Sequence, residues 1–411
     1  MGPTSVSLPS SCDVLVVGAG PAGSACAQLL ARAGMHTVLV DAQAFPRDKV
    51  CGDGLIPDAH AALQRLGVYD EVMAQAQRVR HVGCIGPRGG RVDVPGRLAV
   101  LPRRQLDHII CRAAARAGAQ FHAPLRFEAP LLEHERVVGA RLKAGDTVHE
   151  LRARQVVLAT GAVPQAVIAA GVCERRMPSG VALRGYVHHP AMTSRITELE
   201  VVWHKRLRKG YGWIFPCPDG VFNVGVGLAH SHSKQVDGRQ TMQEVNLREM
   251  FAAFCEVYAP AHELMRGGTL QGDLKGAPLR CSLEGAALTR AGLMVTGEAA
   301  GSTYAFTGEG IGKAMETGML AAKALIDAGA SSFDAAHAPY AAAIGALKPR
   351  FDLYERANRV NDHPWLADLL IWRANRSPSI LKRMEGVLEE SSNPGNLVSA
   401  RGVMKLLLPI R

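Results

Sequence analysis

Cys51 lies in a loop whose side chains could move protons. The bases Arg47 and Lys49 come just before it, and Gly52 and Gly54 follow it. Because neighbouring cations favour a thiolate, Cys51 could have a lowered pKa and serve as a proton donor or as a gate. Glycines at these two positions leave room for a ligand to approach the backbone closely. The alternative is that Cys51 is a small buried residue that only fills space.

Three glycines and an acid near the N-terminus have the spacing of a dinucleotide site. Gly18, Gly20 and Gly23 follow a short apolar run, and Asp41 comes later, at the usual distance of about twenty residues. Gly18 permits a tight turn, Gly20 lets a pyrophosphate approach the backbone, and Gly23 lets a helix pack against a strand. Free N–H groups at the start of that helix would bind the phosphates. The glycines leave open which dinucleotide is bound.

Aromatic residues at 211, 213 and 215 form a second candidate site. Tyr211, Trp213 and Phe215 alternate along an expected strand, so all three side chains point to one face. Such a stripe can belong to an ordinary core or can line a long apolar tunnel. The pattern alone does not separate these two possibilities.

The elements that position the glycines are typical of an α/β fold. Asp13–Val17 and Met35–Val40 predict strands on either side of a helix that begins near Ala22. Val156–Ala162, an apolar strand separate from one at Thr147–Leu151, is a natural partner for the first strand. Further along the chain, three more elements are expected: a strand and tight turn at Leu293–Gly301, a glycine-rich turn at Thr307–Gly312, and a helix from there to about Ala328.

A separate antiparallel sheet is predicted between these elements. Its expected strands are Val181–His188, Glu198–Trp203, Tyr211–Pro216 and Val221–Gly227, and a helix at Met242–Tyr258 follows. Earlier in the chain, two or three short strands are expected at Val79–Ile85, Arg91–Val94 and Leu98–Leu101. We therefore expect interleaved domains. They comprise a Rossmann-type dinucleotide-binding domain (1–78, 102–175 and 285–330), a β-rich substrate domain (79–101 and 176–284) and a helical C-terminal region (331–411).

Composition limits the class of protein. The chain has 411 residues, of which 47% are hydrophobic, and carries a net charge of +10. The excess of bases could attract an anionic substrate or membrane surface, or could be general surface charge. No nucleic-acid motif has its required spacing, and the histidine pairs at 188–189 and 230–232 lack further ligands for a metal. Nine scattered cysteines suit a reducing, cytoplasmic setting.

Membrane association is expected to be peripheral at most. Residues 1–11 do not have the pattern of a signal peptide, and no apolar run is long enough to span a bilayer. The tail beyond residue 397 alternates apolar residues with Arg401, Lys405 and Arg411. A basic amphipathic helix of this kind can lie on a membrane surface, or it can simply dock on the protein body.

From Asp13 to about Ala328 the chain resembles the FAD-dependent geranylgeranyl reductase family. These flavoproteins share their fold with aromatic hydroxylases and flavin-dependent halogenases. The segments that carry the resemblance are Lys49–Leu55, Tyr211–Pro216 and Gly308–Ile311. Several positions differ from the family pattern. Glu298 replaces an aspartate, and Phe306 follows Ala305 where a proline is usual and could project into the pocket. Arg208 replaces a proline before the aromatic motif, and Thr160 stands where hydroxylase relatives have an aspartate.

The resemblance implies that the dinucleotide is FAD. It implies cofactor contacts from Gly18, Gly20, Pro21, Ala22, Gly23, Asp41, Ala42, Lys49, Cys51, Gly52, Arg103, Arg104, Thr160, Gly161, Gly297, Glu298, Gly308, Gly310 and Ile311. Gly310 and Ile311 would lie beside the flavin ring. Cys51, Tyr211 and Trp213 would be catalytic, and Phe215 would help to line the substrate cavity.

The function implied by this resemblance is the reduction of carbon–carbon double bonds in an apolar, isoprenoid-like lipid. Hydride would come from reduced flavin, and NAD(P)H or another reductant would supply the electrons. One alternative is a monooxygenase or halogenase-like enzyme that uses a flavin hydroperoxide. Another is an electron-transfer subunit that docks on a donor partner through a basic face.

Overall fold

The computed structural model describes residues 8–229, 235–236, 239–240, 245–329 and 332–397, together with residues 399, 402 and 404. Most of the basic tail, the histidines at 230 and 232 and the first residues of the helix expected from Met242 lie outside these ranges. Among the described residues, no helix is both long enough and apolar enough to cross a membrane.

A mixed sheet carries the N-terminal glycines. Its core strands are β1 (Ser11–Val17), β2 (Thr37–Val40), β6 (Gln120–His122), β9 (Thr147–Leu158) and β19 (Leu293–Val295), which run parallel in the order β19-β9-β1-β2-β6. The predicted pairing of the two apolar strands is confirmed, since Val16 lies beside Val157. Because β1 is buried on both faces from Val14 to Val17, it reads as a continuous apolar run.

Different elements cover the two faces of this sheet. Helices α1 (Pro21–Arg32), α4 (Arg103–Arg116), α8 (Ile311–Ala328) and α9 (His337–Ala357) contribute to the core on one face. The hairpin of β7 (Arg126–Glu133) and β8 (Arg136–Ala144) extends the sheet from β9, and with α5 (Gln165–Ala169) it covers the other face. The helices predicted after Gly20 and Gly310 are thus confirmed. Each begins directly after a glycine, because Gly20 is the N-cap of α1 and Gly310 is the N-cap of α8.

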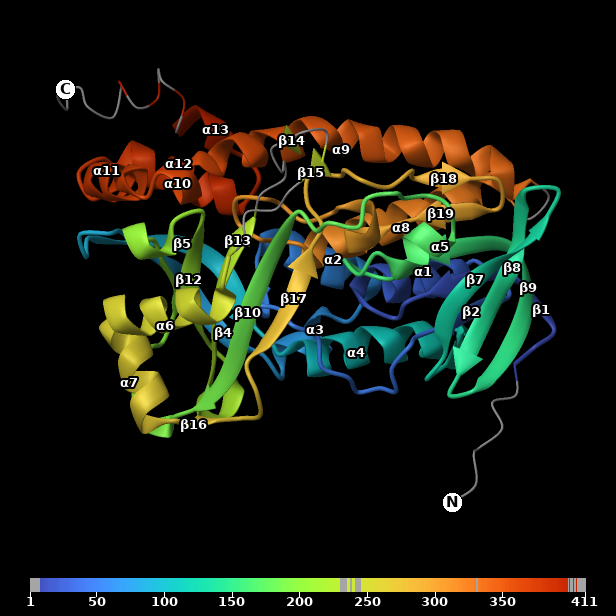
Figure 1. Ribbon diagram of the computed structural model, residues 1–411, viewed down its shortest axis with the longest axis horizontal. Coiled ribbons are helices and arrows are strands. Elements are labelled where there is room, and N and C mark those ends of the chain that lie inside the picture. Colours follow the sequence, from blue (N-terminus) through green and yellow to red (C-terminus); the bar gives the residue numbers. More distant parts are fainter. Residues whose placement is uncertain are drawn as a thin grey trace.

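A second sheet forms the other half of the molecule (Figure 1). Its longer strands are β4 (Gln77–Ile85), β5 (Arg91–Val100), β10 (Gly180–His188), β11 (Leu199–Val202), β12 (Gly210–Pro216) and β13 (Val221–Ala229), in the order β10-β13-β12-β11-β4-β5. The strands β3 (Gly54–Leu55), β16 (Thr269–Leu270) and β17 (Lys275–Leu279) pair at its edges. The predicted antiparallel sheet is confirmed, although β11 and β4 pair in parallel.

Two predicted breaks in strands are wrong. Pro95 and Gly96 do not end a strand, because β5 is continuous and Pro95 faces His81 where the register with β4 shifts. At such an irregularity the missing N–H of proline interrupts no regular pairing. Thr147–Leu151 and the apolar run from Val156 likewise form one strand, β9. In the middle of β9 buried and exposed residues alternate, as in a strand with one face in solvent, and from Gln155 to Leu158 every residue is buried.

Helices pack on both faces of the second sheet. Helices α6 (Leu247–Val257) and α7 (Ala259–Gly267) cover one face, and α10 (Arg359–Asp362), α11 (Trp365–Ala374) and α12 (Pro378–Leu388) lie on the other. Figure 1 shows these three helices and α13 (Pro394–Leu397) gathered at the end of the molecule opposite β7 and β8. The predicted helical C-terminal region is confirmed for the described residues.

Small residues allow α1 and α8 to cross closely. A Cβ atom on Gly318 would lie 2.1 Å from the carbonyl oxygen of Ala22, and one on Gly297 would lie 2.6 Å from the Cβ of Ala22. The hydroxyl of Thr317 accepts a hydrogen bond of 3.0 Å from the Gly297 amide. These contacts hold the N-termini of both helices at one end of the first sheet.

Gly318→Ala should therefore destabilise the fold, although alanine is the better helix former. We expect the free energy of unfolding in urea to fall by about 1–3 kcal/mol, because the new methyl group meets backbone atoms. Gly345→Ala is the matched control, since Gly345 lies within α9 with open space around it. That variant should be more stable by about 0.5–1 kcal/mol. Equal effects at the two positions would contradict the proposed crossing.

Candidate functional site

A single cavity of about 1240 Å³ runs between the two sheets. One end is lined by Gly18, Gly20 and Asp41, and the other by apolar side chains of β4, β5, α11 and α12. Its volume exceeds the roughly 300–1,000 Å³ of an ordinary small-molecule site. The cavity therefore has room for two molecules end to end, one at the polar end and one at the apolar end.

The glycines at the polar end are required by close packing. Gly18 has a φ of +102°, and a Cβ there would lie 2.3 Å from the Ala159 carbonyl oxygen. A Cβ on Gly23 would lie 1.7 Å from the Gly18 oxygen, so Gly23 supports the turn but does not line the cavity. Gly20 does line it, next to the first turn of α1. No side chain of the described residues caps this helix, so its first amides can bind an anion.

Asp41 follows β2 at the edge of the same cavity. Its Oδ2 accepts a hydrogen bond of 2.9 Å from the Ala19 amide, and its Oδ1 accepts one of 3.0 Å from Gln43. The guanidinium Nε of Arg47 lies 3.3 Å from Oδ1. Asp41 therefore braces the glycine turn from the position expected for a ribose-binding acid.

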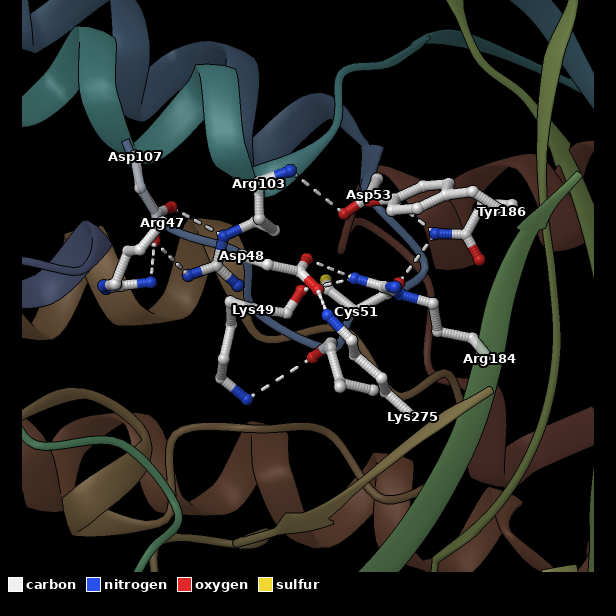
Figure 2. Close-up of polar contacts among 12 residues, drawn as sticks. Arg47, Asp48, Lys49, Cys51, Asp53, Arg103, Asp107, Arg184, Tyr186 and Lys275 are labelled. Atoms are coloured by element: carbon white, nitrogen blue, oxygen red, sulfur yellow. Dashed lines mark hydrogen bonds and ion pairs between the residues drawn. The ribbon is translucent and has the colours of Figure 1, made fainter. Parts of the chain in front are cut away.

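A buried aspartate holds two arginines beside the glycine turn (Figure 2). Asp107 accepts hydrogen bonds of 2.6 and 2.9 Å from Arg103, one turn earlier in α4, and it lies 3.0 Å from Nη1 of Arg47. Arg103 lines the cavity, whereas Arg104 is exposed and does not. Of the two arginines predicted to bind the cofactor, the structure thus brings only Arg103 to the site. The spacing of Arg103 and Asp107 was a signal that sequence reasoning missed.

The loop that carries Cys51 is fastened by the carboxylate of Asp53. Asp53 is fully buried in a left-handed conformation, φ +66°. Its Oδ2 accepts hydrogen bonds of 2.5 Å from Tyr186 and 2.7 Å from Asn223, and its Oδ1 accepts one of 3.2 Å from the Arg103 amide. These bonds join the loop to β10, β13 and α4, as Figure 2 shows in part. Sequence reasoning gave no role to Asp53, Tyr186 or Asn223.

Asn223 extends this network to Cys51 and to the aromatic stripe. Its amide nitrogen also donates a hydrogen bond of 2.7 Å to the Cys51 carbonyl, and its oxygen accepts one of 2.9 Å from the indole of Trp213. A neighbouring anchor is Asp48, which pairs with the buried Arg184 at 2.5 Å and with Lys275 at 2.9 Å. The backbone around Cys51 is therefore held from both sides.

Burial raises the pKa of the Cys51 thiol, and the nearby Arg103 and Lys49 offset only part of that effect. The lowered pKa considered from the sequence is therefore wrong. Desolvation of the thiolate outweighs the attraction of these cations. Cys51 lines the cavity as a neutral thiol that holds its proton at neutral pH.

The aromatic stripe lines the middle of the cavity. Tyr211, Trp213 and Phe215 all reach it from β12, and adjacent ring centroids are 6.3 and 6.4 Å apart. A Cβ on Gly52 would lie 3.1 Å from the Phe215 ring, so this glycine lets the Cys51 loop lie close to the stripe. The stripe is thus both packed and cavity-lining.

The turn before α8 closes the same part of the cavity. The hydroxyl of Tyr211 donates a hydrogen bond of 2.7 Å to the Thr307 carbonyl. Gly308 has a φ of +69°, Gly310 is the N-cap of α8, and both line the cavity with Ile311. Because no described side chain caps α8, its first amides also face an open space. Phe306 lines the cavity as expected from its position in the sequence.

The remaining predicted cofactor residues are arranged around the polar half. Those that line the cavity are Pro21, Ala22, Ala42, Lys49, Thr160, Gly161 and Glu298. Lys49 Nζ lies 3.9 Å from Glu298 across it, and the hydroxyl of Thr160 is buried with no hydrogen-bond partner among the described residues. Gly297 instead packs against Ala22 behind the lining.

A group of half-buried carboxylates lies beside the turn before α8, and two of them, Asp58 and Glu309, line the cavity. Asp58, Glu309 and Glu390 each place one oxygen within 4.8 Å of the others. Burial, with mutual repulsion for Glu309, raises the pKa of Asp58 and of Glu309. The ammonium of Lys313 lies 2.7 Å from Glu390 and 3.7 Å from Asp58. That cation already supplies positive charge at the centre of the group.

These residues fit FAD. The glycine cradle with the open first turn of α1 suits the central pyrophosphate of an extended dinucleotide, and the open first turn of α8 suits the flavin ring at one of its ends. Arg103, Lys49 and the orphaned Thr160 hydroxyl add polar groups along the path between them. The individual contacts of these residues with the cofactor remain our proposal.

Asp53 should give the protein a measurable pH dependence. Burial raises its pKa from 3.8 to about 6, so the folded state binds this proton more tightly than the unfolded state does. The stabilisation that results is complete below about pH 4 and is lost as the pH rises through 6. Relative to Asp53→Asn, the free energy of unfolding of the wild type should therefore fall by roughly 2–3 kcal/mol between pH 4 and 7.5.

This dependence can be measured by chemical unfolding at several pH values. Asp146→Asn, in the exposed turn between β8 and β9, controls for the loss of one negative charge. A difference between wild type and Asp53→Asn that stays constant with pH would contradict the burial of a titrating carboxylate at this position.

Comparison with known proteins agrees with this site. Residues 11–209 match the FAD binding domain family. A menaquinone reductase from Mycolicibacterium smegmatis is 34% identical over 343 residues, 79% of this chain and 78% of that protein. Digeranylgeranylglycerophospholipid reductase 1 from Methanopyrus kandleri is 29% identical over 321 residues, 77% of this chain and 80% of that protein.

A solved structure has the same fold over almost the whole chain. The geranylgeranyl bacteriochlorophyll reductase-like protein from Thermoplasma acidophilum superposes with a TM-score of 0.71 at 22% identity, covering 97% of this chain and 96% of that one. The FAD-binding domain and the reductase relatives together identify an FAD-dependent oxidoreductase. The chain belongs to the FAD-dependent geranylgeranyl reductase family.

Proposed function

We propose that this enzyme reduces carbon–carbon double bonds in the isoprenoid chain of a lipid. The observation that carries the proposal is the continuity of the cavity. Its polar half fits FAD, its other half is apolar, and Cys51 with the aromatic stripe lies between the two. A long apolar substrate that enters the apolar half would place its inner end next to the flavin.

The apolar half can bind such a chain through burial alone. Its walls are formed by Val82, Cys84, Val94, Leu199, Val201, Trp203, Leu370, Ile371, Met384, Val387 and Leu388. Each methylene group moved from water into such a wall contributes about 0.8 kcal/mol. Binding along the chain would therefore orient a double bond that has no polar group of its own.

The names of the relatives support this class of substrate. A menaquinone and a digeranylgeranyl glycerophospholipid have different head groups, but both carry a polyprenyl chain. The chemistry that the two have in common is an isolated alkene within a long apolar tail. We infer that this shared part is what the apolar half of the cavity recognises.

When bound, FAD supplies the hydride for one alkene carbon. Cys51 would deliver the proton to the other carbon, since its buried thiol keeps that proton at neutral pH. Tyr211 holds the turn before α8 in place, and Trp213 is fixed through Asn223, so both keep the wall beside the reacting bond rigid. The surrounding apolar side chains exclude water from the site.

The source of electrons and the setting of the enzyme belong to the same proposal. NAD(P)H or another reductant would reduce the flavin. A cytoplasmic enzyme in peripheral contact with a membrane would have access to polyprenyl lipids in the bilayer.

The reaction can be tested with holoenzyme reduced by dithionite without oxygen. The substrates are a menaquinone with a geranylgeranyl chain and a digeranylgeranyl glycerophospholipid, each dispersed in detergent. We expect products that are heavier by two hydrogens and that keep this mass after mild oxidation with ferricyanide. Loss of the added mass would show reduction of the quinone ring instead. Oxygen uptake in air with a hydroxylated product would favour a monooxygenase.

Cys51→Ser should retain FAD and lose most of the turnover. We expect the rate of alkene reduction to fall at least tenfold, because a hydroxyl is a far weaker acid than a thiol and general acids typically contribute 10²–10⁴-fold. Flavin content, from the visible spectrum of the purified protein, should match the wild type. Cys255→Ser, on α6 away from the cavity, is the control. Unchanged turnover in Cys51→Ser with full FAD would contradict the role of Cys51.

A further inference from the structure

Helix α11 is apolar on two opposite faces. Leu366, Ala367, Leu370 and Ile371 are buried on one side, and three of them line the apolar half of the cavity. On the other side two large aromatic side chains face solvent: Trp365 is 55% exposed and Trp372 is 43% exposed. Large apolar side chains that gather at the surface mark an interaction site, so the outer face of α11 is a candidate for a partner.

The outer face forms a narrow stripe. Trp365, Leu369 and Trp372 follow one another at spacings of four and three residues, which place them on one side of α11, and Arg376 comes just after the end of this helix. The guanidinium of Arg376 lies 5.0 Å above the Trp372 ring. Lys382 and Arg383 are exposed on the next helix, α12. We call these six residues the lipid face.

We propose that the lipid face docks on the surface of an anionic bilayer and that polyprenyl substrates enter the cavity from there. This inference rests on the proposed function. Tryptophan is enriched at the boundary between lipid head groups and tails, and flanking bases attract anionic lipids. The opposite face of the same helix already lines the apolar half of the cavity, so one helix separates the bilayer from the substrate site.

A second copy of the chain is a less suitable partner. A two-fold interface brings the same patch of both subunits together. Arg376, Lys382 and Arg383 would then face their own copies. The acid of α11, Asp368, is already bonded to Arg88. A negatively charged lipid surface complements both the bases and the aromatic rings.

The experiment measures vesicle binding by the holoenzyme. Vesicles of phosphatidylglycerol and phosphatidylcholine in equal parts, or of phosphatidylcholine alone, are sedimented with the protein. We expect binding to the anionic vesicles that weakens at high salt, and at least tenfold weaker binding to the neutral ones. Equal binding to both, or no binding to either, would overturn the proposal.

Tryptophan fluorescence gives a second readout without activity. The chain has four tryptophans, and the other two, Trp203 and Trp213, are only 8% and 6% exposed. Brominated lipids should therefore quench Trp365 and Trp372, and the double variant Trp365→Phe/Trp372→Phe should lose that quenching. Quenching that persists in this variant would show that the lipid contacts another part of the protein and would overturn the proposed docking surface.

Variants separate the lipid face from other exposed residues. Trp365→Ser/Trp372→Ser and Arg376→Gln/Lys382→Gln/Arg383→Gln should each weaken binding to anionic vesicles at least tenfold. The control is Leu132→Ser, since Leu132 is 52% exposed on β7 at the opposite end of the molecule (Figure 1). Normal binding by the first two variants would overturn the proposal. So would a wild-type dimer that the tryptophan variant converts to monomers.

Activity distinguishes failure of this inference from failure of the proposed function. With substrate dispersed in detergent, the lipid-face variants should reduce it at the wild-type rate. With substrate embedded in vesicles, their rate should fall in step with binding. Reduction in detergent without any vesicle binding would refute only the docking surface. Vesicle binding without reduction in either form would refute the proposed function and leave the surface intact.

Discussion

The carboxylate of Asp53 is the interaction on which the site depends most. Three parts of the chain that are far apart in sequence meet at its two oxygens, on β10, β13 and α4. Without this anchor the loop that carries Cys51 would be held only by the bond from Asn223 to the Cys51 carbonyl and by the ion pairs of Asp48. Burying a charge is costly unless hydrogen bonds compensate for it. Here Tyr186 and Asn223 donate from behind the cavity lining, and the third donor is the backbone amide of the cavity-lining Arg103. The buried hydrogen bonds of the fold are therefore concentrated around the loop whose position the proposed chemistry depends on.

The cavity unites two kinds of binding in one space. Its polar half binds through backbone amides and a few charged side chains, whose hydrogen bonds require a defined geometry and therefore fix the orientation of a ligand. Its apolar half depends on surface area, which has no direction and tolerates chains of different length. The segment between the halves has both apolar and polar groups. The rings of Trp213 and Tyr211 are apolar, and their polar atoms donate hydrogen bonds to Asn223 and to the Thr307 carbonyl. This arrangement suits a reaction at an apolar bond next to a charged cofactor.

Much of this could be predicted from the sequence, because local patterns determine local elements. The glycine turn, the strand at Val156 and the helix after Gly310 each follow from spacing within a short window, and the sheet assignments hold. What could not be predicted depends on contacts between distant segments. The side-chain partners of Asp53, Tyr186 and Asn223, lie more than a hundred residues away. The pKa of Cys51 depends on burial, which the neighbouring bases in the sequence do not reveal. The continuity of β5 through Pro95 could not be predicted for the same reason, because the register shift that accommodates this proline exists only where β5 pairs with β4.

The close crossing of α1 and α8 has a consequence for biosynthesis. The two helix N-termini that face the cavity belong to segments that begin at Pro21 and Ile311. A ribosome that adds about 5–20 residues each second must synthesise most of the chain between these two events. The turn before α8 and the first residues of α8 line the cavity, so the complete lining exists only after α8 has been synthesised.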